Sequence, residues 1–228
     1  MQPRDTQVLP IASETTVYRS RTWDRLKFEI EYGLQRGTTA NSYLIQGDKT
    51  VLVDPPGESF TEIFLNALQQ RISPTAIDYI ILGHVNPNRA ETLKALLKLI
   101  PNATLVCSNP AAISLQKLLG ETKANYLVIK GEEILDLGQG HTLEFLLTPT
   151  PRWSDQLCTY DTKTRILFTD KFFGAHVCGE QILDEGWQVY QEDRRYYFDC
   201  LMAPHASQVG SILEKFQGKP AQIYGTGH

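Results

Sequence analysis

The sequence lacks any apolar run of the roughly 18 residues that a membrane-spanning helix needs. No apolar segment follows the polar N-terminus, Met1 to Asp5, so we expect no secretory signal. A basic excess is also missing, because 22 Lys and Arg face 26 Asp and Glu and the net charge is −4. This balance disfavours general binding to nucleic acid or anionic membranes but leaves a small basic site open. We therefore predict a cytoplasmic protein with no membrane insertion and no nucleic-acid partner.

Cysteine is scarce, and its spacing excludes the usual cysteine-based sites. The four cysteines lie at positions 107, 158, 178 and 200 and form no CxxC pair. A structural zinc site normally needs such paired ligands. Without a signal sequence, the simplest interpretation is four free thiols in a reducing compartment.

The composition is that of a folded chain, with 228 residues, of which 42% are hydrophobic. This is enough apolar material for a single domain over residues 1–228. Alternating or buried-type runs predict strands at 16–18, 43–45, 51–53, 77–82, 104–107, 126–129, 142–147, 157–160, 166–169 and 221–224. Helical spacing predicts helices at 59–71, 90–99, 109–119 and 191–216, the last interrupted near Pro204, with Ser59 and Glu62 as a capping box. Strands in both halves with interspersed helices favour sheets inside and helices outside.

Four loops that directly follow predicted strands concentrate the polar side chains. These loops span residues 84–89, 148–155, 167–174 and 224–228. Loops at strand ends are where mixed α and β proteins hold their chemistry. We therefore take these four segments as the candidate site.

The order and spacing of the four loops resemble the metallo-β-lactamase fold over about residues 25–228. More specifically, they resemble the N-terminal domain of a diflavin flavodiiron protein of the cyanobacterial type. In that family the loops read His-x-Glu-x-Asp-His, Thr-Pro-x-x-His-Trp, a metal-bridging Asp before Phe-Gly, and a final Gly-His. The resemblance implies an α+β fold, an αββα metallo-β-lactamase-like four-layer sandwich. Carried over position by position, the family's seven diiron-ligand positions fall on His84, Asn86, Asn88, Arg89, Arg152, Lys171 and His228.

Only two of these seven positions, His84 and His228, keep a metal-ligating side chain. Arginine and protonated lysine offer no lone pair, and an asparagine amide is a weak ligand. We therefore predict a degenerate diiron site that binds no iron and has no catalytic residues. Three cations at ligand positions are expected to share one pocket, where they pair with carboxylates or hold an anion. A buried Lys171 needs a partner, for which Asp54, Asp155 and Asp170 are candidates, although Asp155 and Asp170 also suit loop caps.

The resemblance further implies that flavodoxin-like and flavin-reductase domains follow in a longer native protein. FMN alone, or FMN together with FAD, would then belong to that full-length protein and not to these residues. Three functions stay open. The first is part of an oxidoreductase that passes electrons from NADH or NADPH through flavin to oxygen, within a head-to-tail homodimer or a heterodimer with a ligand-complete paralogue. The second is a non-catalytic anion-binding or scaffolding domain. The third, a metal-dependent hydrolase, lacks the ligands to activate water.

Overall fold

A computed structural model describes residues 4–24, 26 and 33–228. Met1 to Pro3, on which the expected absence of a signal partly depends, lie outside the described residues. So do residues 25 and 27–32, where the family resemblance begins. Within the described part of the chain, no helix is both long and apolar enough to cross a membrane.

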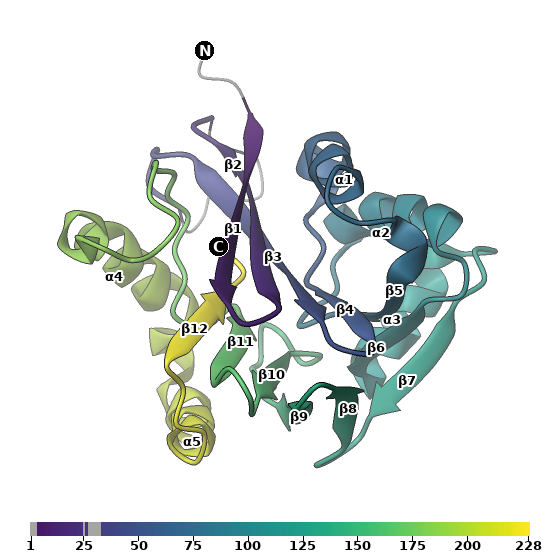
Figure 1. Cartoon of the computed structure of the whole chain (residues 1–228). Helices are drawn as coiled ribbons and strands as arrows, with labels where there is room; N and C mark the ends of the chain where they lie inside the picture. The colour runs from purple at the N-terminus through teal and green to yellow at the C-terminus, as the bar shows by residue number, and fades with distance from the viewer. Residues whose placement is uncertain (1–3, 25, 27–32) are drawn as a thin grey trace.

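The N-terminal half forms a seven-stranded sheet with the strands in sequence order (Figure 1). Its strands are β1 (Asp5–Ala12), β2 (Thr15–Thr22), β3 (Thr38–Gln46), β4 (Thr50–Val53), β5 (Ile77–Ile81), β6 (Thr104–Ser108) and β7 (Asn125–Ile129). Pairs from β1 to β4 are antiparallel, and pairs from β4 to β7 are parallel. The parallel pairs bring the carboxyl ends of β4 and β5 to the same edge of the sheet.

The C-terminal half forms a five-stranded sheet in the order β12-β11-β10-β9-β8. Its strands are β8 (Ile134–Gly138), β9 (His141–Leu147), β10 (Leu157–Asp161), β11 (Ile166–Asp170) and β12 (Ile223–Thr226). All neighbours are antiparallel except β11 and β12, which run parallel. Both β11 and β12 therefore end on the same side of this second sheet.

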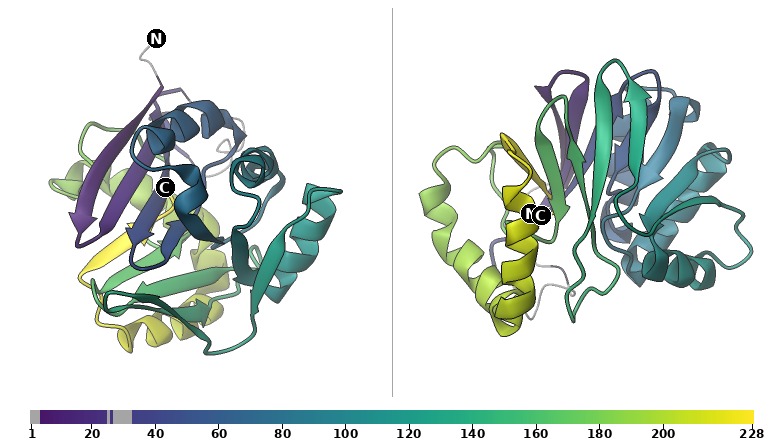
Figure 2. Two further views of the ribbon diagram at one scale, coloured as in Figure 1. Left: turned by 45° about the vertical axis from the view of Figure 1, so that its right-hand side comes forward. Right: turned by 90° about the horizontal axis from the view of Figure 1, so that it is seen from below.

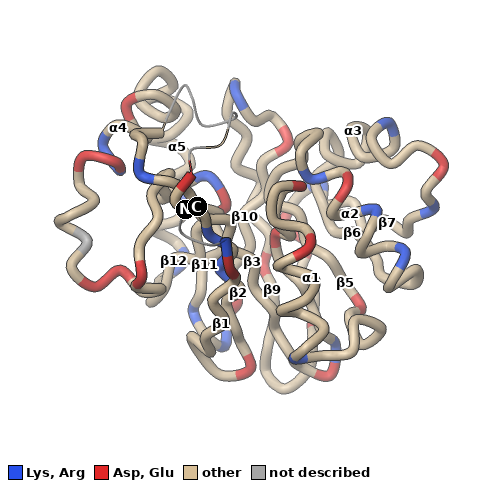
Figure 3. Tube along the Cα trace, turned by 90° about the horizontal axis from the view of Figure 1, so that it is seen from above, with Lys and Arg blue, Asp and Glu red and all other residues tan. Residues whose placement is uncertain are grey.

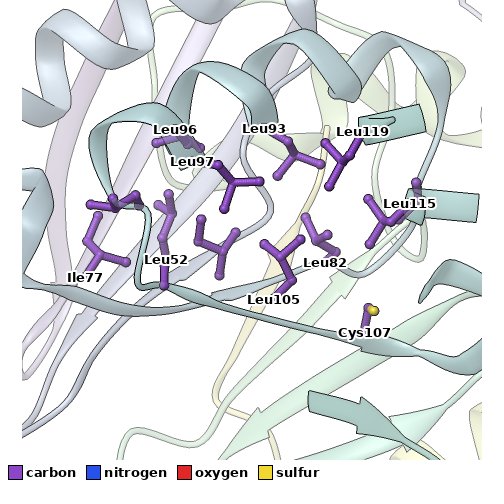
Figure 4. Packing of buried hydrophobic residues seen from close by; sticks show 14 of the residues in the cluster. Leu52, Ile77, Leu82, Leu93, Leu96, Leu97, Leu105, Cys107, Leu115 and Leu119 are labelled. Atoms are coloured by element: carbon purple, nitrogen blue, oxygen red, sulfur yellow. The ribbon is translucent and has the colours of Figure 1, made fainter. Parts of the chain in front are cut away.

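Helices cover the outer faces of the two sheets, which pack against each other (Figure 2). They are α1 (Thr61–Gln69), α2 (Pro87–Leu99), α3 (Asn109–Leu119), α4 (Gln191–Leu201) and α5 (Ala206–Gln217). Leu93 and Leu115 of the first three helices join Leu52 and Leu105 in one buried cluster (Figure 4). A second cluster fills the space between the sheets, and a third packs α4 and α5 on the second sheet. These three apolar layers confirm the predicted αββα sandwich.

Most predicted elements are present, with a few corrections. Strands β1 and β8 were not predicted from the sequence, and only part of β2 was predicted. The proposed capping box is wrong, because Phe60 is the N-cap of α1 and makes no side-chain cap, following a short 3-10 turn over Glu58–Phe60. All four cysteines are free thiols, as expected. Residues of both charge signs are spread along the chain (Figure 3).

Candidate functional site

A cavity of about 610 Å³ opens where strands of both sheets end. Its walls include Asp54 after β4, His84 after β5, Lys171 after β11 and His228 after β12. Six of the seven predicted positions line it: His84, Asn86, Asn88, Arg89, Lys171 and His228. The structure therefore gathers most of the residues that the loop pattern singled out, from segments far apart in the sequence.

Arg152 is the exception among the seven positions. Its side chain is exposed and lies over the Trp153 ring, with its guanidinium carbon 5.8 Å from the ring centroid. Trp153 lines the cavity, but Arg152 does not. The expectation of three cations in one pocket is therefore wrong, because two of them, Arg89 and Lys171, meet there.

Arg89 lies in the first turn of α2 and is buried, with only 6% of its surface exposed. Asn86 is the N-cap of this helix and accepts a hydrogen bond from the Arg89 backbone N–H at 3.1 Å. The guanidinium donates to Asp54 Oδ1 at 3.0 Å and to Asp170 Oδ1 at 3.1 Å. It also donates to the His84 carbonyl at 2.8 Å. Arg89 thus joins the ends of β4, β5 and β11.

Lys171 adds a second cation to the same group. Its Nζ lies 3.4 Å from Asp170 Oδ1, so Asp170 is the partner that a buried lysine needs. The same Nζ is 3.3 Å from His228 Nε2, and His228 Nδ1 donates to the Thr39 carbonyl at 2.7 Å. Because Nδ1 carries the proton, Nε2 accepts from the lysine. We refer to Asp54, Arg89, Asp170 and Lys171 as the charge cluster.

His84 is oriented by a carboxylate of the second loop. Its Nδ1 donates to Asp155 Oδ1 at 2.7 Å, while Asp155 Oδ2 accepts from the Val85 backbone N–H at 2.8 Å. Asp155 is therefore a bidentate partner of the 84–89 loop. This arrangement leaves His84 Nε2 as the one ring nitrogen of His84 that Asp155 does not engage.

Burial and neighbouring charges give the two carboxyls of the charge cluster different pKa values. Burial, together with the negative charge of Asp170, raises the pKa of Asp54 to about 6. Burial alone would raise the pKa of Asp170 as well, but the charges of Lys171 and Arg89 outweigh it and lower that pKa. Burial lowers the pKa of Lys171. Asp170 is therefore the carboxylate that stays ionised between the two cations.

The histidines of the cavity are neutral at pH 7. Burial lowers the pKa of His228 to about 3 and also lowers the pKa of His84. Burial holds the pKa of His176 well below its usual value, and the neighbouring His228 adds to the effect. The two rings lie 4.3 Å apart between centroids. Positive charge in the cavity is therefore carried by Arg89 and Lys171.

The backbone brings the two carboxyls together at a cost. Asp54 and Asp170 both adopt left-handed conformations, with φ of 52° and 47°. Gly83 lies between them, and a Cβ at this position would come within 2.8 Å of Asp170 Cβ and 3.1 Å of Asp54 Oδ2. Such strain usually marks a functional or formerly functional site.

Comparison with known proteins places this site in a family. The profile of the ODP family beta lactamase matches residues 38–213, which is more than half of the chain. The chain belongs to the ODP family. It is 62% identical to diflavin flavoprotein A 6 of Nostoc and 64% identical to diflavin flavoprotein A 3 of Synechocystis, in each case over 100% of this chain. The ODP-family chain spans only 40% and 38% of the length of these two relatives.

Solved structures agree with this assignment. A metal-soaked Flv1 flavodiiron core from Synechocystis superposes with a TM-score of 0.96 and 63% identity, covering 99% of this chain and 57% of the other. A fragment of diflavin flavoprotein A 5 from Nostoc gives 0.94 and 55%, covering 99% and 88%. A Thermotoga maritima flavo di-iron protein shares the fold, with a TM-score of 0.88 at 23% identity, covering 100% and 58%. The expected fold and family resemblance are therefore confirmed.

Two positions that the family resemblance implies as iron ligands carry cationic side chains in this ODP-family site. They are Arg89 and Lys171, and neither offers a lone pair while protonated. Lys171 engages Nε2 of His228, whereas Asp155 engages only Nδ1 of His84 and leaves its Nε2 open. Within the described ranges, no three His, Cys, Asp or Glu side chains are grouped to hold a metal.

Sequence reasoning missed part of this ODP-family site. His176 was not among the predicted site residues, yet it is buried, lines the cavity and shares a hydrogen bond with the Thr38 hydroxyl at 2.8 Å. Tyr197 was not singled out either; it is buried, lines the cavity and donates to the Lys171 carbonyl at 3.2 Å. Asp54 and Asp170 were named as candidate lysine partners, and Asp170 also as a loop cap. Their place at the ends of two buried strands was the available signal for both.

Proposed function

We propose that this chain is the lactamase-like domain of a diflavin flavodiiron oxidoreductase, without a competent diiron site of its own. The observation that carries the proposal is the charge cluster. Arg89 and Lys171 occupy ligand positions and are held there by Asp54 and Asp170 at 3.0–3.4 Å. Fixed cations would repel a metal ion from this pocket. The domain by itself is proposed to be catalytically inactive.

In the longer protein that the relatives' length suggests, flavin would be supplied by domains outside these residues. Their names describe diflavin flavoproteins, and this chain matches about two fifths of them. We propose that electrons pass from NADH or NADPH through flavin to oxygen, giving water, at a ligand-complete partner. The lactamase-like domain would then serve as a platform in a cytoplasmic, head-to-tail dimer. A heterodimer would contain the ligand-complete partner itself, whereas a homodimer would depend on a separate one.

Metal analysis of the purified chain after incubation with ferrous iron tests the proposal. We expect far less than one iron per chain, because the ligands are absent. The matched control is a ligand-complete flavodiiron core treated identically, which should load. About two iron atoms per chain, bound tightly enough to survive desalting, would show that the proposal is wrong.

A non-catalytic anion-binding or scaffolding role is the second candidate, favoured by the two cations that line the cavity. Thermal unfolding distinguishes an anion-binding role from a purely structural role of the cations. Chloride or phosphate is exchanged for a bulky anion while the ionic strength is kept constant. An anion-specific rise in Tm that is lost in Lys171→Met supports binding. If the Tm is the same in all salts, Arg89 and Lys171 have a purely structural role.

A further inference from the structure

A second cavity lies back to back with the candidate site and is not explained by the proposed function. This groove has a volume of about 560 Å³, a size typical of small-molecule sites. Asn41 and His228 line both cavities, so the end of β12 and the middle of β3 form the wall between them. The opposite wall is the segment from Phe173 to Tyr190.

Arg19 of β2 is the unusual group in this groove. It is 9% exposed, and its two hydrogen bonds both leave from Nη1, to Gln7 Oε1 at 2.7 Å and to the Gly179 carbonyl at 2.8 Å. Both acceptors are neutral. The part of the chain that the structure describes supplies Arg19 with no carboxylate at ion-pair distance and leaves its Nε and Nη2 without a hydrogen bond.

Neighbouring arginines show that this is particular to Arg19. Arg21, two residues along β2, pairs with Asp5 at 2.5 Å and with Glu180 at 2.7 Å. Arg194, which also lines the groove, pairs with Asp184 at 2.6 Å. Burial lowers the pKa of Arg19, as expected for a cation that has lost water without gaining a carboxylate. An anion in the groove would offset this cost.

The rim of the groove is aromatic and exposed. Phe173 and Tyr224 are 43% and 49% exposed, and their ring centroids lie 4.8 Å apart. Leu183, 48% exposed, adds apolar surface to the lining. Aromatic side chains arranged in this way favour a ligand with a flat ring. Asn41 contributes a buried Oδ1 without a hydrogen-bond partner among the described residues.

We propose that this groove binds a small aromatic anion, whose acidic group pairs with Arg19 and whose ring packs against Phe173 and Tyr224. The carboxylate or phosphate would take the free edge of the guanidinium in a bidentate contact. The ligand class is defined by this combination of one unpaired buried cation with an apolar, aromatic rim. The inference does not depend on whether the neighbouring cavity holds a metal.

Calorimetric titration of the 228-residue chain with 1-naphthoate, 1-naphthyl phosphate and neutral 1-naphthol tests the proposal. We expect saturable one-to-one binding of the anions. Naphthol should bind at least about tenfold more weakly than the anions, because it cannot form the charged hydrogen bond to Arg19. The ranking of the two anions identifies the preferred acidic group, and binding of either supports the site. Equal affinity for naphthol and naphthoate, or no binding of either anion, would overturn the proposal.

Single-residue variants test whether naphthoate binds in the groove. Arg19→Gln should weaken naphthoate binding by roughly tenfold to a hundredfold. The exposed Leu183→Glu should weaken it by charge repulsion without disturbing the core, and it decides the question if Arg19→Gln fails to fold. Arg195→Gln is the control, because Arg195 pairs with Asp199 on the surface of α4 and does not line the groove. Unchanged affinity in Leu183→Glu, or a loss in Arg195→Gln of the same size, would place any binding elsewhere.

Discussion

Replacing Arg89 by methionine tests whether the charge cluster holds the two sheets together. Methionine keeps much of the side-chain volume but leaves Asp54 and Asp170 without the guanidinium that binds both. Removing one partner of a buried ion pair costs about 3–5 kcal/mol. For a domain of this size, each kcal/mol shifts Tm by about 2–4 °C. We therefore expect Tm to fall by roughly 6–20 °C.

Urea unfolding followed by circular dichroism gives the free energy of unfolding for a double-mutant cycle. Adding Asp54→Asn to Arg89→Met removes the carboxyl whose one ion pair was with Arg89, whereas Asp170 keeps Lys171, and it should recover part of the loss, with a coupling energy of about 0.5–3 kcal/mol. Arg195→Met is the control, because this arginine has an exposed ion pair worth at most about 1 kcal/mol. A loss below about 1 kcal/mol in Arg89→Met, or strictly additive effects in the cycle, would refute the reasoning.

Three further predictions concern the site and the core. Gly83→Ala should lower Tm without changing secondary structure, because its Cβ would press on Asp170 and Asp54; an unchanged Tm would show that the strand ends can move apart. Leu93→Ala, at a fully buried position, should cost about 2–5 kcal/mol in urea unfolding. His228→Asn should flatten the pH dependence of the free energy of unfolding. In the unfolded chain this histidine takes up a proton near pH 6.5, whereas in the folded chain its pKa is about 3. The stability that this group contributes is therefore complete above pH 6.5 and declines below it. Between pH 7 and pH 5 the loss in the parent chain should exceed that in the variant by up to about 2 kcal/mol, and equal slopes would contradict the assignment.

Much of the fold was predictable, because local patterns and tertiary packing agree. The hairpin of β3 and β4 was visible in two apolar runs around Gly47, and Pro110 marked the start of α3. β1 and β8 were missed for a common reason. Each lies at the edge of its sheet and is mostly half-buried or exposed, so neither shows a strong apolar run.

The location of the site was predictable from the sequence, but the ion pairs between its side chains were not. The spacing of the loops correctly predicted that Arg89 and Lys171 lie in one cavity, because this spacing follows from the order of the strands. Arg152 was misplaced because a position within a loop does not fix the direction of a long side chain, which here lies over Trp153. His176 was not singled out because it lies six residues beyond the end of β11, outside the four loops that were taken as the candidate site.

The pairing also explains why the substitutions at ligand positions form one unit. Asp54 and Asp170 are buried, and with neutral side chains in place of Arg89 and Lys171 they would form two uncompensated charges in a low-dielectric interior. Arg89 alone bridges both carboxylates, and Lys171 adds a second cation to Asp170, so two positive side chains face two carboxyls. The expected contribution of the cluster to stability and its proposed exclusion of metal both rest on these two side chains, so changing either one alone leaves an unbalanced charge.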